Sequence, residues 1–207
     1  IVSLCKRRGF VFPGSEIYGG LAGIYDYGPM GVELRHNIKQ HFWNKFIAER
    51  DDMYGMSAAI LMPERVWEAS GHTELFTDPL VECGICHERV RADHIKYLKD
   101  STGKISGNVW VCESCGLENQ KLETRQFNLL LQTHLGASEK SATKAYLRGE
   151  ITQGVHVNFK NVLDSMHPKL PFGIGQIGKA FRNEIAPRDF LFRQREFEQM
   201  ELQYYIR

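Results

Sequence analysis

Four of the five cysteines occur as two closely spaced pairs, a pattern typical of a metal site. Cys83 and Cys86 form one C-x2-C pair, and Cys112 and Cys115 form another. Each pair can fold into a tight knuckle that presents two thiolates, so the two pairs match the tetrahedral sulfur set of structural zinc. We predict a Zn²⁺ ion with no open coordination position, and a free Cys5. Four reduced thiols without metal are the alternative, and a disulfide suits a cytosolic chain less well.

Arginine and glutamate side chains are concentrated between residues 172 and 205, where the sequence predicts a strand, a loop around Pro187 and a second strand. One face of this hairpin carries Gln176, Gly178, Ala180, Arg182 and Glu184, followed by Arg195, Phe197, Gln199 and Glu201. The other face of the second strand carries Met200, Leu202, Tyr204 and Ile206, which alternate as if one side entered the core. The charged face suits a pocket for a phosphorylated, zwitterionic ligand. An exposed hairpin with cross-strand ion pairs is the alternative.

The hairpin resembles a motif of a known family. FRNE, a loop and FRQREFEQME are similar to motif 2 of the class II aminoacyl-tRNA synthetases. The resemblance to the dimeric type of glycyl-tRNA synthetase covers most of the chain, including RRGFVFPGSEIYGGLAGIYDYGPMGVELRHNIKQHFW, MSAAILMPERVWEASGH and YLRGEITQGVHVNFKNVLDS. It implies an α+β fold, in which a class II synthetase-type antiparallel sheet is flanked by helices and carries an inserted zinc-ribbon-like subdomain.

This resemblance implies a ligase that activates glycine with ATP to glycyl-adenylate and transfers the glycyl group to the 3′ end of tRNA(Gly). Mg²⁺ would bridge the phosphates of ATP. The implied ATP-binding residues are Arg182, Asn183, Glu184, Phe192, Arg193, Gln194, Arg195, Glu196 and Phe197. Arg182 is the implied catalytic residue, because its planar guanidinium could hold both the α-phosphate and the glycine carboxylate. By the same resemblance, Glu184 accepts from the adenine amino group, Phe197 stacks on adenine, and Arg193 reaches the β- or γ-phosphate.

The implied glycine-binding residues are Arg91, Glu150, Phe197, Gln199 and Glu201. Glu150 and Glu201 supply the carboxylates that we expect around the ammonium group of the ligand. Glu150 lies in RGEITQG, where the family has R-P-E-T-A-Q-G, so Gly149, Ile151 and Thr152 depart from the pattern. Glycine in place of proline gives this loop more backbone freedom.

Three further features have competing interpretations. Arg91, in RADH, resembles a family position that contributes to substrate binding, but a surface charge cluster is the alternative. His72 is a candidate acid–base group, but we interpret it as structural or as a polar contact, because the implied reaction needs no protein base. The segment Gly173–Gly178 spells G-x-G-x-x-G, but Pro171 cuts short the preceding strand and no helical pattern follows, which disfavours a dinucleotide-binding fold. In a strand, these glycines could instead let a ligand approach the backbone.

The remaining pattern predicts the elements that position these residues. Leu34, Ile38, Phe42 and Phe46 recur every four residues. This spacing predicts a core-facing amphipathic helix over residues 32–50. We expect an apolar strand over 56–63, a helix over 138–146 and another over 155–164. By resemblance, the first helix and residues 53–63 correspond to motif 1, which implies a homodimer.

We expect three segments along the chain. Residues 1–80 correspond to the N-terminal part of a catalytic domain with motif 1, residues 81–122 to the inserted zinc-ribbon-like subdomain, and residues 123–207 to the continuation with motif 2. The family also has a third motif and an anticodon-binding domain. Neither is recognisable in these residues, so we expect a longer natural chain.

Composition excludes some classes of protein. A chain of 207 residues is long enough for one domain with an insertion. Its 26 basic and 25 acidic residues balance, so charge gives no independent support for a nucleic-acid partner. No run of about 18 apolar residues is present and the N-terminus lacks a secretory signal, so we predict a cytoplasmic protein without a membrane partner.

A non-catalytic relative, which kept the fold for binding nucleic acid or a partner, is the main alternative function. Such a protein is expected to lose the residues that contact the ligand, whereas this chain keeps Arg182, Glu184, Arg193, Phe197 and Glu201. A zinc-ribbon binding module with a scaffold is a second alternative, but it leaves the charged face of the hairpin unexplained.

Overall fold

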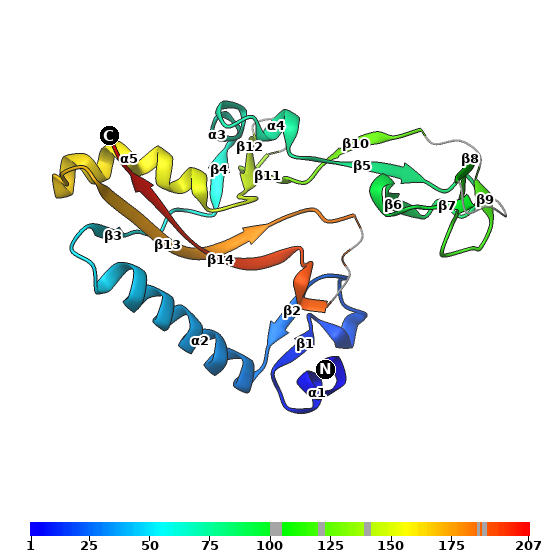
Figure 1. Ribbon diagram of the computed structural model, residues 1–207, viewed down its shortest axis with the longest axis horizontal. Coiled ribbons are helices and arrows are strands. Elements are labelled where there is room, and N and C mark those ends of the chain that lie inside the picture. The colour runs from blue at the N-terminus through cyan, green and yellow to red at the C-terminus, as the bar shows by residue number, and fades with distance from the viewer. Residues whose placement is uncertain (100–104, 120–122, 139–141, 186, 188–189) are drawn as a thin grey trace.

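The computed structural model describes residues 1–99, 105–119, 123–138, 142–185, 187 and 190–207 (Figure 1). Its α-helices are α1 (Val2–Arg7), α2 (Pro29–Trp43), α3 (Glu64–Ala69), α4 (His72–Leu75) and α5 (Thr152–Met166). Short 3-10 or π turns are η1 (Glu16–Tyr18), η2 (Asn44–Ala48), η3 (Ala92–His94) and η4 (Phe190–Phe192). Its strands are β1 (Val11–Pro13), β2 (Tyr25–Tyr27), β3 (Met53–Gly55), β4 (Leu61–Pro63), β5 (Thr77–Glu82), β6 (Arg89–Arg91), β7 (Lys96–Lys99), β8 (Ile105–Val111), β9 (Glu118–Asn119), β10 (Arg125–Asn128), β11 (Leu131–Leu135), β12 (Thr143–Leu147), β13 (Phe172–Phe181) and β14 (Glu196–Tyr205).

The fold mixes helices with mainly antiparallel strands, as the α+β prediction requires. Within the described residues the strands form small sheets in the orders β1-β2, β10-β5-β6, β11-β12-β4, β14-β13-β3 and β7-β8-β9. Only β3 pairs in parallel there, with β13. The predicted antiparallel pairing is therefore present, but in the described residues the strands are divided among several sheets.

The predicted hairpin is confirmed and consists of β13 and β14, each ten residues long. Its register places Gln176 opposite Glu201, Gly178 opposite Gln199, and Ala180 opposite Phe197. Side chains directly opposite each other lie on the same face of an antiparallel pair. The predicted polar face is therefore formed, and we call it the polar face of the hairpin below.

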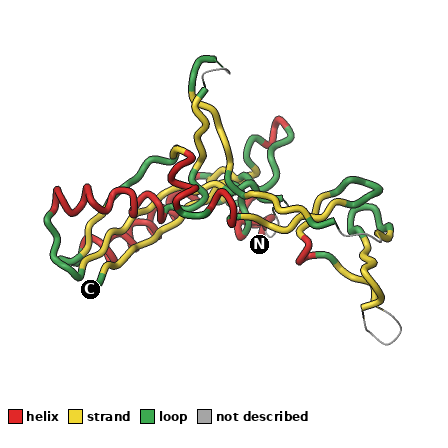
Figure 2. The backbone as a smooth tube through the Cα atoms, turned by 90° about the horizontal axis from the view of Figure 1, so that it is seen from above, coloured by secondary structure: helices red, strands yellow, loops and turns green. Residues whose placement is uncertain are grey.

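Helix α5 packs on the hairpin and confirms the helix predicted over residues 155–164. Val155 forms a buried cluster with Phe172 and Ile174 of β13. Phe159 stacks on Phe172 with ring centroids 5.8 Å apart and also contacts Tyr205 at 4.5 Å. These apolar contacts fix α5, and with it the loop that precedes α5, against the hairpin (Figures 1 and 2).

Helix α2 lies on the other side of the hairpin (Figure 1). It begins at Pro29, because proline suits the first turn of a helix, and continues into η2. Arg35 and Lys39 of α2 lie 2.5 and 3.0 Å from the carboxylate oxygens of Glu198 on β14. Charged contacts therefore attach α2 to the hairpin, and the helix predicted over residues 32–50 is confirmed.

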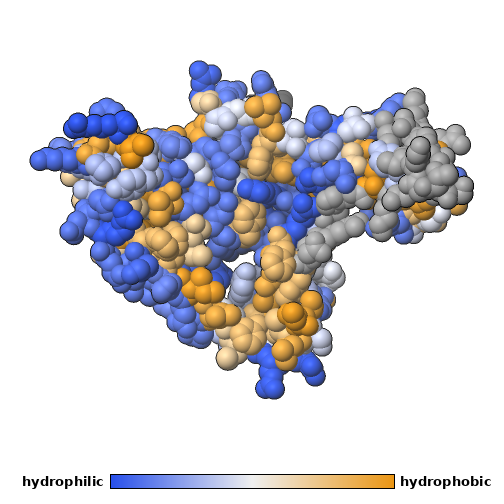
Figure 3. Space-filling model, viewed as in Figure 1, coloured by the Kyte–Doolittle hydropathy of each residue, from blue (hydrophilic) through white to orange (hydrophobic). Residues whose placement is uncertain are grey.

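The prediction that the apolar stripe of α2 faces a core is wrong within this chain. Leu34 and Ile38 are 51% and 49% exposed, and Phe46 is also exposed. Met200 and Tyr204, which we expected to enter the core from β14, are exposed as well. Figure 3 shows apolar residues along the side of α2 that faces the hairpin. Leu34 and Ile38 line a cavity that α2 shares with β14 and η4, so this side of the helix is not packed into a core.

The apolar strand predicted over residues 56–63 is also wrong, because only Leu61–Pro63 is a strand there. Met56 still bonds through its N–H to the backbone of Gly175 in β13, whereas both backbone groups of Ala58 bond to side chains. The N–H of Ala58 donates to Gln176, and its carbonyl oxygen accepts from Arg148. Side-chain partners therefore replace the ladder of a sheet at Ala58.

The helix predicted over residues 138–146 is wrong where the chain is described, and residues 139–141 lie outside the described ranges. Residues from Thr143 onwards form β12, which pairs with β11 on one side and β4 on the other. Hydrogen bonds to two neighbouring strands outweigh the helical preference of alanine and lysine. Ala145 and Tyr146 are both buried in this central strand.

Residues 77–128 form an arm that extends from the helices and the hairpin (Figures 1 and 2). Strand β5 pairs with β10 and β6, and β7, β8 and β9 form a separate sheet. Val81, Trp110 and two cysteines form a small buried core in this arm. In the described ranges, no helix has the length and apolar character needed to cross a bilayer.

Candidate active site

The loop that carries Glu150 lies across the polar face of the hairpin. The N–H of Ile151 donates to Oε1 of Gln199 at 3.2 Å, and its carbonyl oxygen accepts from Nε2 of Gln176. Gln176 is fully buried, and its own side-chain oxygen accepts from the N–H of Ala58 at 3.3 Å. These bonds join three segments that are distant in the sequence and place Glu150 beside the hairpin.

The two predicted carboxylates are each held through one oxygen. Oε2 of Glu201 accepts from Oγ1 of Thr152 at 2.6 Å, and Oε1 of Glu150 accepts from Nε2 of Gln153 at 2.7 Å. Nε2 of His72 lies 3.3 Å from that same Glu150 oxygen. Among the described residues, Oε1 of Glu201 and Oε2 of Glu150 have no such partner. Each carboxylate therefore retains an oxygen that could accept from an ammonium group.

Arg182 lies between two aromatic rings beside this loop. Its guanidinium carbon is 5.2 Å from the ring centroid of Phe76 and 5.2 Å from that of Phe197. Its Nε donates to the carbonyl oxygen of Gly149 at 3.0 Å. Ring faces attract a guanidinium, so these contacts hold the planar group while leaving its two terminal nitrogens for an anion.

Arg148 anchors the loop that carries Glu150 to the hairpin and to Ala58. It is 2% exposed, and it donates to the carbonyl oxygens of Lys179 at 2.7 Å and Ala58 at 2.9 Å. No carboxylate pairs with it in the described part of the chain, and burial lowers the pKa of its guanidinium. A Cβ atom at Gly178 would lie only 2.1 Å from Nη2 of Arg148. Gly178 therefore makes room for a side chain of this chain, which corrects our expectation that it admits a ligand.

A cavity of about 710 Å³ lies between α2 and the loop end of the hairpin. Its lining includes six of the predicted ATP-binding residues, namely Arg182, Glu184, Phe192, Arg193, Gln194 and Phe197. Nε of Arg193 lies 3.6 Å from Oε2 of Glu184, a buried oxygen that accepts no hydrogen bond within the described residues. Glu184 could therefore accept from a ligand in this cavity. Phe192 is 95% exposed and lies at the rim.

Three other predicted ATP-binding residues do not line this cavity. The guanidinium of Arg195 donates to the carbonyl oxygens of Glu184 and Ala22, and so holds the hairpin loop against residues 19–24. Glu196 pairs with Lys179 across the hairpin. Asn183 donates its N–H to the carbonyl oxygen of Leu129. Their roles in binding ATP remain predictions.

Arg91 lies on β6 at the base of the arm. Its guanidinium binds both carboxylate oxygens of Asp93 and also contacts Asp78. The hydrogen bonds that Arg91 donates to Asp93, and the negative charges of Asp78 and Glu184, raise the pKa of Arg91. Arg91 is therefore near enough to the cavity for Glu184 to influence it, but its charge is already paired, and substrate contact remains a prediction.

Similarity to known proteins extends over all of this chain. It is 49% identical over 212 residues to the glycine–tRNA ligase of Cutibacterium acnes, and 51% identical over 207 residues to that of Treponema denticola. Each match covers 100% of this chain. The chain is homologous to the glycine–tRNA ligases. It spans about half the length of these relatives, 45% and 44% respectively. No protein-family model matches the chain.

The fold of this glycine–tRNA ligase relative is shared with other class II synthetases. A threonyl-tRNA synthetase structure from Cryptosporidium parvum superposes with a TM-score of 0.57 at 15% identity, covering 99% of this chain and 36% of that one. A prolyl-tRNA synthetase from the same organism superposes with a TM-score of 0.54 at 14% identity, covering 97% and 28%. At such low identity these likenesses support the fold alone.

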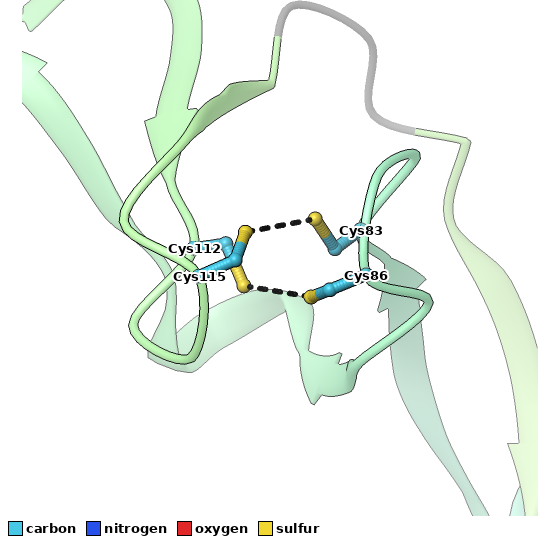
Figure 4. A group of neighbouring side chains, drawn as sticks. All are labelled: Cys83, Cys86, Cys112 and Cys115. Carbon is cyan, nitrogen blue, oxygen red and sulfur yellow. Dashed lines mark hydrogen bonds between the residues drawn. The ribbon is translucent and has the colours of Figure 1, made fainter.

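The four paired cysteines of this chain come together in the arm. Cys83 and Cys86 face Cys112 and Cys115 from opposite loops (Figure 4). Their sulfur atoms all lie within 4.8 Å of one another, with the cross-loop separations at 3.8 and 3.6 Å. Tetrahedral Zn–S bonds of about 2.3 Å separate sulfurs by about 3.8 Å. The cluster therefore fits zinc, and Cys5 lies outside it, as predicted.

Asn119 links the two cysteine loops. Its side-chain N–H donates to the sulfur of Cys83 at 3.4 Å and to the carbonyl oxygen of Leu117, while its oxygen accepts from the N–H of Gly84 at 3.0 Å. The backbone N–H of Cys86, together with Asn119, lowers the pKa of Cys83 to about 6. Metal ions bind the thiolate, so this lowered pKa favours the ligating form of Cys83. Burial and the neighbouring thiols raise the pKa of Cys86 to about 12 and also raise that of Cys115.

Phe76 was not predicted from the sequence, whereas His72, interpreted as structural or as a polar contact, does contact Glu150. Both lie in the short segment after α3, where neither helical nor strand periodicity marks them. In the folded chain, Phe76 packs on Arg182 and His72 lies beside Glu150, so both reach the candidate site. The RGEITQG motif predicted the carboxylate, but the sequence contains no comparable signal for the residues that support it.

Proposed function

We propose that a protein containing this chain is a glycine–tRNA ligase, which activates glycine with ATP and transfers the glycyl group to the 3′ end of tRNA(Gly). Homology over the whole chain supports this. The observation on which the proposal rests is the convergence of Arg182, Glu150 and Glu201 on the polar face of the hairpin. This arrangement offers one cation for a carboxylate or phosphate and two carboxylates for an ammonium group.

In the first step of the proposed reaction, the glycine carboxylate attacks the α-phosphate of ATP and releases pyrophosphate. The substrate supplies the nucleophile, so the protein must orient the reactants and stabilise negative charge. Arg182 would contact both the carboxylate and the α-phosphate through its free terminal nitrogens. Arg193, Phe197 and Glu184 would hold the remainder of ATP in the cavity, and we assign no protein ligand to its Mg²⁺.

The site would select glycine over larger amino acids through the limited room beyond the α-carbon as well as through charge. Glu150 and Glu201 would accept from the ammonium group, and Gln199 from the same face would limit the room beyond the α-carbon. Excluding a larger amino acid by steric clash discriminates strongly, whereas rejecting a smaller one does not. A site for the smallest amino acid therefore needs no editing step.

We also propose a structural Zn²⁺ ion on the four-cysteine cluster, with residues 81–122 as the inserted subdomain and residues 1–80 and 123–207 as parts of one catalytic domain. Reduced cysteines at such a cluster suit the cytoplasm. The homodimer is proposed from the resemblance of α2 and residues 53–63 to motif 1, and the exposed ring of Phe46 in η2 is available for such a contact. Sedimentation of the protein as a monomer at micromolar concentration would contradict the dimer.

The proposed activity is tested by glycine-dependent exchange of pyrophosphate into ATP. The assay uses the full-length natural protein that contains these residues. We expect Arg182→Ala to nearly abolish exchange, and Glu201→Gln to raise the KM for glycine far more than the KM for ATP. Arg65→Ala and Glu68→Gln are matched controls on an exposed face of α3 and should change neither constant. Undiminished exchange in Arg182→Ala would reject the role assigned to Arg182. No exchange in the unaltered protein would reject the proposed activity and favour a non-catalytic relative.

A further inference from the structure

His72 begins α4, and both nitrogens of its ring have polar neighbours. Nδ1 lies 2.9 Å from Oγ of Ser70, and Nε2 lies 3.3 Å from Oε1 of Glu150. A carboxylate oxygen only accepts, so the second contact is attractive when Nε2 carries a proton. The ring packs near those of Trp67 and Phe76, with centroids 5.3 and 5.0 Å away, and the side chain is 15% exposed. Packing on the ring thus holds Nε2 near the carboxylate.

Glu150 is restrained from two directions at a single oxygen. Nε2 of Gln153 donates to Oε1 at 2.7 Å from within the same loop, and His72 faces that oxygen from a separate segment. Contact with Gln153 alone would allow the carboxylate to turn, because one short-range hydrogen bond does not fix its plane. With His72 on the same oxygen, Oε2 is the oxygen left for a ligand.

We propose that His72 is a positioning residue of the amino-acid site, which orients Glu150 so that Oε2 meets the ammonium group of glycine. This inference rests on the proposed function, since it acts on the glycine site. His72 touches neither substrate nor the reacting atoms, so its loss should weaken glycine binding and leave ATP binding intact. Ordering of a binding group before the ligand arrives lowers the entropy lost on binding.

Two substitutions separate the polar contact from ring packing. His72→Phe keeps an aromatic ring beside Trp67 and Phe76 but has no donor, whereas His72→Gln loses the ring but places an amide N–H close to the position of Nε2. We expect His72→Phe to raise the KM for glycine roughly tenfold in pyrophosphate exchange, with the KM for ATP unchanged. His72→Gln should stay within about twofold to threefold of the unaltered protein.

Two results with the His72 variants would contradict the proposal. An unchanged glycine KM in His72→Phe, or an equal rise in both variants, would overturn the positioning role. His134→Phe is the matched control, because this histidine is exposed on β11.

Glu150→Gln separates the failure of this inference from the failure of the proposed function. If that change leaves the glycine KM unaltered, the glycine site itself is wrongly assigned. If Glu150→Gln raises it and His72→Phe does not, only the role of His72 fails. When both raise it, the double variant should be less than additive, since His72 acts through Glu150.

Discussion

Nε of Arg182 donates to the carbonyl oxygen of Gly149 at 3.0 Å, and this bond connects the hairpin to the loop that carries Glu150. The position of the cationic group and that of the neighbouring carboxylate are thereby coupled. A Cβ atom at Gly149 would lie 2.9 Å from the ring of Phe76, which is also the ring beside Arg182. The glycine that departs from the family pattern thus borders the residues that hold the arginine.

Arg182→Lys should reduce glycine-dependent pyrophosphate exchange by about 100-fold or more, although the charge is kept. Lysine lacks the planar fork that can donate to Gly149 and contact an anion at once, and it stacks less well between two rings. Steady-state exchange rates at saturating ATP and glycine measure this. Arg65→Lys on α3 is the control, and activity within about threefold of the unaltered protein in Arg182→Lys would contradict the assigned geometry.

Thr152→Ala should raise the KM for glycine by roughly threefold to tenfold. Its hydroxyl holds one oxygen of Glu201 at 2.6 Å, so removing it frees the carboxylate to turn. Thr152→Ser keeps the hydroxyl and should behave like the unaltered protein. Thr143→Ala, at an exposed position of β12, provides a further control. Equal glycine KM values for the Ala and Ser variants would show that the hydroxyl has no such role.

One Zn²⁺ ion per chain should remain after exhaustive dialysis, as measured by metal analysis. Cys83→Ser should lose this metal, because it removes one of four thiolates, and the arm should lose stability on the order of several kcal/mol. Cys5→Ser should retain the full metal content, since Cys5 lies outside the cluster. Stoichiometric zinc in Cys83→Ser, or none in the unaltered protein, would refute a four-cysteine site.

Glu198→Gln should destabilise the fold at pH 7 by about 1 to 2 kcal/mol in urea unfolding, because it breaks the contacts of β14 with Arg35 and Lys39. Burial alone would raise the pKa of Glu198, but the hydrogen bonds from these two cations outweigh burial and lower it. The stabilisation from ionised Glu198 is therefore fully present above the unfolded pKa of about 4.3, and it is lost as the pH falls through the lower folded value.

The difference between Glu198→Gln and the unaltered protein should accordingly shrink between pH 5 and pH 3. Glu49→Gln, at an exposed pair with Lys45, should show little difference at either pH. A difference for Glu198→Gln that is independent of pH would indicate a packing effect and not an ionic one.

The sequence alone determined the features that depend only on residues close together in the chain. The spacing of Cys83, Cys86, Cys112 and Cys115 predicted two knuckles that would supply four sulfurs. Alternation along residues 172–205 predicted which side chains share a face of the hairpin, because the period of a strand is a property of its backbone. The family motifs likewise indicated Glu150 and Arg182.

Only the tertiary structure decided what depends on partners far away in the sequence. Residues 143–147 became a central strand because β11 and β4 both pair with it, despite a locally helical composition. Phe76 and His72 reached Arg182 and Glu150 only through the path of the folded chain. Periodicity describes one element at a time, whereas these contacts depend on hydrogen bonds and packing between elements, so their physical cause is absent from any single stretch of sequence.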